Sequence, residues 1–187
     1  MQIATIGPEF SLARLYMKQL LSGEIEDAKI GYHILKLTRD FSRAFELFFV
    51  LGDTKNMEKA WDALEKLKKL SRERSLSLTI DPEVYYPLQR AEALHELWTF
   101  MKNSAPIPRE TFSKALTILR GSPIYKEVLL TLKEYFESRG YDVPEELMEA
   151  LNKLSKPKET DYWEEYQKTL KEFGEKGKKF HERAKEE

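Results

Sequence analysis

The stretch of sequence that decides the fold runs from residue 41 to residue 51 and reads FSRAFELFFVL. It contains four phenylalanines, and between Ala44 and Leu51 only Glu46 is polar. A helix that is apolar on nearly all of its sides belongs in the middle of a bundle, where other helices cover it from several directions. We therefore predict that this stretch is the central element of an all-α core.

In the rest of the chain, proline occurs near predicted helix starts and glycine just after predicted helix ends, as is typical of helical proteins. Apolar residues recur at helical spacing between these signals. The predicted helices lie at about 8–21, 24–51, 55–74, 87–102, 109–120, 123–139 and 144–154. The long second helix contains Gly31 and the polar pair Arg39–Asp40, so it could also be two pieces.

Two local features of this pattern make sharper predictions. Thr54 is expected to cap the third helix. The short turn before it makes this helix antiparallel to the central stretch, which places Trp61 against Phe45, Phe48 or Phe49. Because a proline inside a helix costs about 3 kcal/mol, we expect a short turn at 82–86 and a helix that begins at Pro87. The sequence thus predicts a multi-helix bundle over 1–154, followed at 155–187 by a linker (155–159) and a charged amphipathic helix.

The composition excludes several classes of function. Basic and acidic residues nearly balance, at 31 and 32, so the whole chain has no strong field for nucleic acid or anionic membranes. There are no cysteines, which excludes disulfides and thiol chemistry. The longest apolar run is too short to span a bilayer, and we expect a cytoplasmic protein. Scarce amides with abundant lysine and glutamate are typical of thermophilic proteins.

The C-terminal residues carry an aromatic seam, which we define as Trp163, Tyr166, Leu170, Phe173 and Phe180. Together with Gly177 and Ala184, these residues recur at alternating spacings of three and four, as do the a and d positions of a coiled coil. A narrow apolar stripe on an otherwise charged helix needs one partner surface. The seam is therefore predicted to bind a protein partner or a second copy of this chain.

No motif supports catalysis or a cofactor. Glu92 and His95 have the Glu-x-x-His spacing of half a di-iron site, but the other ligands of such a site are missing from the pattern. His95 also lies on the apolar face of its helix, where a packed histidine is the ordinary explanation. We predict no metal site, no cofactor and no enzymatic activity.

The alternative hypothesis is a factor that associates with nucleic acid or with a ribonucleoprotein, for example with the ribosome. Two features favour it. The first is a basic cluster near the end of the third helix that could contact phosphates. It comprises Lys66, Lys68, Lys69, Arg72 and Arg74. The second is the hairpin at 109–139, which resembles a helix-turn-helix in its short turn at Gly121–Ser122. The preferred hypothesis remains a non-catalytic interaction or adaptor protein, which forms homodimers or docks on a larger assembly through the aromatic seam.

Overall fold

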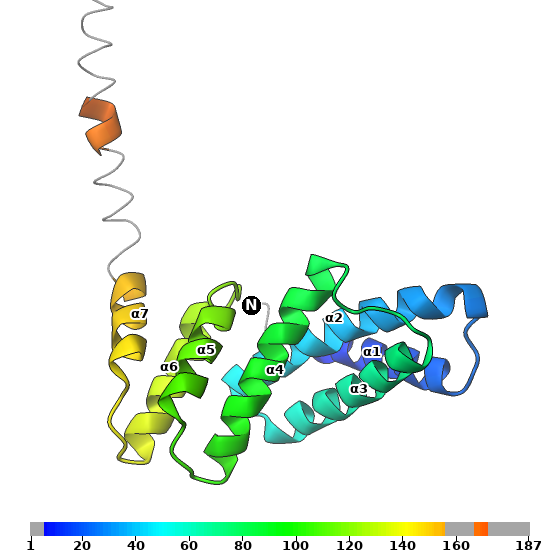
Figure 1. Ribbon diagram of the computed structural model, residues 1–187, viewed down its shortest axis with the longest axis horizontal. Coiled ribbons are helices and arrows are strands. Elements are labelled where there is room, and N and C mark those ends of the chain that lie inside the picture. Colours follow the sequence, from blue (N-terminus) through cyan, green and yellow to red (C-terminus); the bar gives the residue numbers. More distant parts are fainter. Residues whose placement is uncertain (1–5, 156–166, 172–187) are drawn as a thin grey trace, which may run out of the picture. The chain divides into compact units, whose positions relative to one another are not determined.

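The computed structural model describes residues 6–155 and 167–171, and within these ranges the chain is all-α, as predicted (Figure 1). Residues 167–171 are also helical. The chain divides into two compact units, Met1–Asp142 and Val143–Glu187. The labelled helices are α1 (Ile6–Leu21), α2 (Asp27–Leu51), α3 (Thr54–Glu73), α4 (Pro82–Lys102), α5 (Arg109–Leu119), α6 (Tyr125–Ser138) and α7 (Glu145–Ser155). The predicted linker at 155–159 lies almost wholly outside the described residues.

Helix α2 is the centre of the first unit, and it packs against α1, α3 and α4 and also contacts α6. All four phenylalanines of the 41–51 stretch are buried. Phe10 of α1 packs edge-on against both Phe41 and Phe48, and Trp61 of α3 lies 5.6 Å from Phe45 between ring centroids. The predicted central role of this stretch, and its contact with Trp61, are confirmed.

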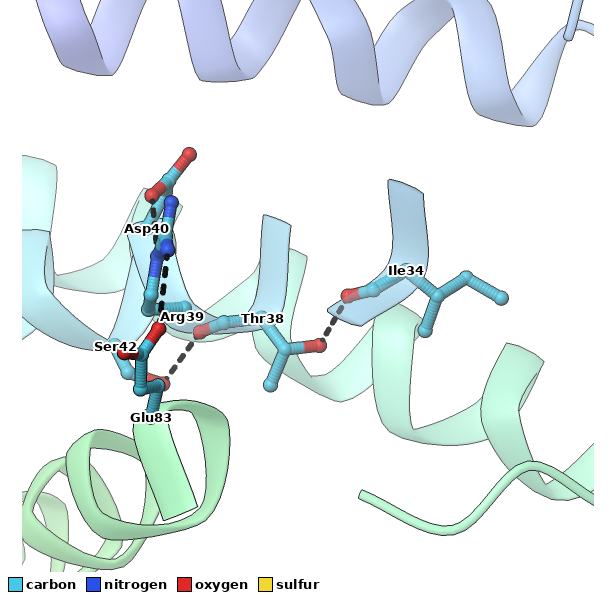
Figure 2. Close-up of polar contacts among 6 residues, drawn as sticks. All are labelled: Ile34, Thr38, Arg39, Asp40, Ser42 and Glu83. Carbon is cyan, nitrogen blue, oxygen red and sulfur yellow. Dashed lines mark hydrogen bonds and ion pairs between the residues drawn. The ribbon is translucent and has the colours of Figure 1, made fainter. Parts of the chain in front are cut away.

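The polar residues in the middle of α2 do not break it. Thr38 and Ser42 are buried, and their hydroxyls donate to the backbone carbonyls four residues earlier, Ile34 and Thr38, at 2.7 Å and 2.6 Å (Figure 2). Each hydroxyl therefore has a partner without leaving the helix. The alternative of two separate helices over 24–51 is thereby excluded.

The turn between α2 and α3 differs from the prediction by one residue. Gly52 ends α2 with a φ of 70°, a left-handed conformation that favours glycine. Asp53, not Thr54, caps α3, because its carboxylate accepts a hydrogen bond from the backbone N–H of Asn56 at 3.2 Å. Thr54 is instead the first residue of the helix. The short turn holds α2 and α3 as an antiparallel pair.

Helix α4 corrects a second prediction, since it begins at Pro82 and continues through Pro87. Asp81 caps it by accepting a hydrogen bond from the N–H of Glu83 at 3.0 Å. The missing N–H of Pro87 deprives only the carbonyl of Glu83, an exposed residue of the first turn that water can reach. Burial of the proline ring offsets this small loss.

Helices α5 and α6 complete the first unit, in which α5 packs on α4. Phe112 and Phe136 meet edge to face with ring centroids 5.5 Å apart. The apolar stripes predicted for both helices are buried, including Leu119 and Leu132. Among the described residues, no helix combines the length and the apolar character needed to cross a membrane.

Candidate functional site

Only part of the predicted basic cluster forms one exposed face. Lys68 Nζ lies 2.9 Å from a carboxylate oxygen of Glu92, and Arg74 pairs with Asp27 at 3.3 Å. The remaining three members are exposed: Lys66, Lys69 and Arg72. Because these three follow one another at spacings of three, they lie along one side of α3. Two of the five cations are thus already in ion pairs, and three remain on one exposed side.

The hairpin at 109–139 has six basic residues and four glutamates, but three of these glutamates lie on its second helix, α6. The exposed face of α6 carries Lys126 and three glutamates (Glu127, Glu134 and Glu137). Lys133 on the same helix is 3.6 Å from Glu137, in an i,i+4 pair. A helix that enters the major groove of DNA needs positively charged side chains that contact the backbone phosphates. The geometry of α6 is that of a packed bundle helix.

The aromatic seam lies mostly outside the described residues. Trp163, Tyr166, Phe173 and Phe180 all fall outside them. Only Leu170 is described, in the helical stretch 167–171, and it is 52% exposed. One member of the seam is therefore known to present its apolar side chain to solvent.

The two residues of the Glu-x-x-His pair are held by different neighbours. Glu92 is bound to Lys68. The His95 ring stacks on the Trp61 indole, with centroids 3.7 Å apart and planes within 5° of parallel. Within residues 6–155 and 167–171, no three potential metal-ligating side chains come together. The structure does not bring this pair into a common site.

His95 stands in a cluster of aromatic rings and cations. The Phe45 and Trp98 rings are 6.0 Å and 6.1 Å from it. Burial lowers the pKa of His95 below its usual value of 6.5, and the positive charges of Lys102 and Lys68 lower it further, against an opposing effect of Glu65. The neutral imidazole is thus favoured, which suits a ring stacked flat on an indole.

An open cleft lies next to this cluster; we call it the α4 groove. Its volume is about 450 Å³. Its lining is mainly apolar and comes from the α2–α3 turn region, the end of α4 and α6. The lining residues are Phe49, Gly52, Thr54, Met57, Glu58, Trp98, Met101, Lys102, Thr131, Tyr135 and Arg139.

Cations stand at the rim of the α4 groove beside its aromatic rings. Lys102 Nζ is 4.8 Å from the centroid of the Trp98 ring, and the Arg139 guanidinium is 6.0 Å from the Tyr135 ring. Such cation–π contacts hold the long side chains beside the cleft instead of across it. The α4 groove therefore offers an apolar floor and a positively charged rim.

A second cleft, of about 320 Å³, lies between α1 and α2; we call it the α1–α2 groove. Its two walls differ in character. The α1 wall is formed by Glu9, Phe10, Leu12, Ala13 and Tyr16, and the α2 wall by Lys36, Arg39, Asp40, Arg43 and Ala44. One wall is thus largely apolar, and the other carries three cations and one carboxylate.

The three cations of the α1–α2 groove have different surroundings. Arg39 lies between two carboxylates, 3.3 Å from Asp40 and 3.9 Å from Glu83 of α4 (Figure 2). The Lys36 ammonium is 5.7 Å from the Tyr16 ring centroid. Arg43 is exposed, and its side chain forms no ion pair within the described part of the chain. Arg43 is the cation most available to an incoming group.

Sequence reasoning missed one polar cluster entirely. Glu46, 2% exposed, accepts a hydrogen bond from Arg90 Nε at 3.1 Å and a second from the Ser122 hydroxyl. The Ser122 oxygen in turn accepts from the backbone N–H of Ile124 at 3.1 Å. The signal was present, because Glu46 is the one polar residue in an apolar run. Its partners are 44 and 76 residues away and could not be read from local pattern.

No family model, curated protein or solved structure matches this chain. We therefore infer function from the two grooves and from the charges around them.

Proposed function

We propose that this chain is a non-catalytic α-helical interaction protein of the cytoplasm, which forms homodimers or docks on a larger assembly through its aromatic seam. The observation that carries the proposal is the α4 groove. Aromatic, methionine and arginine side chains are the residues enriched at protein interfaces, and three of these types line this cleft: Trp98, Met101 and Arg139. Its volume falls within the range of about 300–1,000 Å³ typical of binding clefts.

The seam supplies the complementary chemistry. Its members are large apolar side chains, and the one that is described, Leu170, is half exposed. Transfer of apolar surface from water into a cleft contributes about 25 cal/mol for each Å². A protein segment that inserts such side chains into the α4 groove gains from this term, while the cationic rim favours acidic flanking residues.

The nucleic-acid alternative draws less support from the geometry. A binder of phosphates needs several cations on one surface. Two of the five cations at 66–74 are already paired, and α6 presents mainly glutamates.

The proposal is tested by removing the seam from the full chain. Replacing Trp163, Leu170 and Phe173 together by serine should lower the mass in light scattering, or abolish capture of the partner from source cells. Met101→Glu, which places a charge in the α4 groove, should have the same effect. Leu130→Ser is the matched control, since Leu130 is an exposed leucine of α6 outside both grooves. Unchanged mass together with unchanged capture would contradict the proposal.

A further inference from the structure

The α1–α2 groove brings cations and apolar side chains together. Lys36, Arg39 and Arg43 follow one another on α2 at spacings of three and four, which places them on one face over about 10 Å. The facing wall comes from Phe10, Leu12, Ala13 and Tyr16. Leu12 is exposed and Tyr16 partly so, whereas Phe10 and Ala13 are buried. Arg14 adds a fourth cation beside that wall, with its guanidinium 6.0 Å from the Phe10 ring centroid.

Carboxylates within the groove neutralise only part of this charge. Asp40 is held by Arg39, which it neutralises in part. Glu9 is exposed on α1. Lys36 and Arg43 form no ion pair among the described residues, so the groove retains an excess of positive charge next to an apolar surface.

The sequence contains a segment of matching chemistry, residues 159–166, which reads ETDYWEEY. We call it the acidic aromatic segment. It holds four carboxylates, no basic residue and three aromatic side chains. Its aromatic residues include Trp163 and Tyr166 of the seam. No other stretch of eight residues in the chain combines four acids and three aromatics without a base.

We infer that the α1–α2 groove of one copy binds the acidic aromatic segment of a second copy. This inference depends on the self-association proposed above. It assigns residues 159–166, with Trp163 and Tyr166, to the α1–α2 groove, so that Leu170, Phe173 and Phe180 of the seam remain for the α4 groove. Carboxylates of the segment face Lys36 and Arg43, and an aromatic side chain lies against Leu12 and Tyr16 of the α1 wall. Each copy has one groove and one segment, so a reciprocal pair of contacts closes a two-fold dimer.

The test is a charge-swap cycle in the full chain, followed by sedimentation equilibrium. Lys36→Glu with Arg43→Glu should raise the dimer dissociation constant about tenfold or more, as should Glu164→Lys with Glu165→Lys, since close interfacial charge pairs couple strongly. The variant with all four substitutions should recover most of the lost affinity, because the pairs are restored with opposite signs. The wild-type dissociation constant should also rise with added NaCl.

The control is Lys66→Glu with Lys69→Glu, which makes the same change of charge on exposed positions of α3 and should leave the constant unaltered. Thermal unfolding by circular dichroism verifies that each variant is folded. If serine substitution of the seam weakens the dimer but the swap at Lys36 and Arg43 does not, the groove is the wrong site and the proposed function stands. If the wild-type chain is monomeric at millimolar concentration, the inference and the homodimer fall together, and only docking on another protein is left. Failure of the fourfold variant to regain affinity also overturns the inference.

Discussion

Arg43 and Glu46 lie one turn apart on α2, yet the fold uses their charges in opposite ways. Glu46 faces the core, where Arg90 and Ser122 satisfy its carboxylate. Arg43 faces water at the edge of the α1–α2 groove. The comparison teaches that a charge contributes to folding when it is desolvated with partners, and is free for recognition when it remains hydrated. The two positions are only about 60° apart on a helical wheel, so it is the tertiary structure that places one in the core and the other in water.

The largest expected effect on stability comes from removing the counter-ion of the buried residue, Glu46. Arg90→Met removes the counter-ion and leaves Glu46 charged in the core, which should cost about 3–5 kcal/mol of unfolding free energy. Arg43→Met makes the identical chemical change on the exposed face and should stay within about 0.5 kcal/mol of wild type. Urea unfolding measures both. Equal losses for the two variants would show that the buried pair has no special role.

The double variant sharpens this result. Glu46→Met with Arg90→Met removes both charges from the core and should be far more stable than Arg90→Met alone, because no buried charge is left unpaired. A double variant as unstable as the single one would mean that shape, and not charge, determines the loss.

A smaller effect is expected at the third member of the cluster. Ser122→Ala leaves one oxygen of Glu46 without its donor and frees the backbone N–H of Ile124, at a cost of about 1–3 kcal/mol. Ser22→Ala is the matched control, since the Ser22 hydroxyl donates to Gln19 on the exposed surface. The loss should be near zero there. Chemical denaturation that gives the same value for both would contradict this assignment.

The smallest effect concerns His95, which lies between the two extremes of burial. Its pKa is lowered in the folded chain, chiefly by burial, so as pH falls the unfolded chain takes up the proton first. The contribution of the neutral ring is fully present above pH 6.5 and is lost as pH falls from there toward the lower folded pKa. The unfolding free energy of wild type should therefore decrease more between pH 7.5 and pH 5 than that of His95→Gln. Superimposable pH profiles would remove His95 as the cause.

The sequence predicted the elements whose cause is local. Four phenylalanines indicated that α2 is the centre, and the short α2–α3 turn predicted that Trp61 packs on this stretch, where it lies against Phe45. The start of α4 was predicted wrongly because the cost of Pro87 depends on its position: the hydrogen bond it cannot make is to the carbonyl of Glu83, in the exposed first turn, and this loss is small. Asp53 rather than Thr54 caps α3, a shift of one residue that propensity does not resolve.

The candidate site was less accessible to sequence reasoning. Lys36, Arg39 and Arg43 share a face by their spacing alone, but the apolar wall opposite them comes from Phe10 and its neighbours on α1. The α4 groove likewise joins residues from Phe49 to Arg139. Periodicity tells which side of a helix is apolar; it does not tell which two helices leave space between them.

The Glu46 cluster also determines the alignment of the bundle. A helix as uniformly apolar as residues 44–51 could slide or rotate against its neighbours and still bury similar areas of hydrocarbon. Glu46 limits that freedom, because in the observed alignment its carboxylate lies between Arg90 of α4 and Ser122 of the α5–α6 turn. A shift or rotation that separated these groups would leave the buried carboxylate without its partners. The Glu46 carboxylate thus favours the observed packing of α2, α4 and the α5–α6 turn over shifted ones.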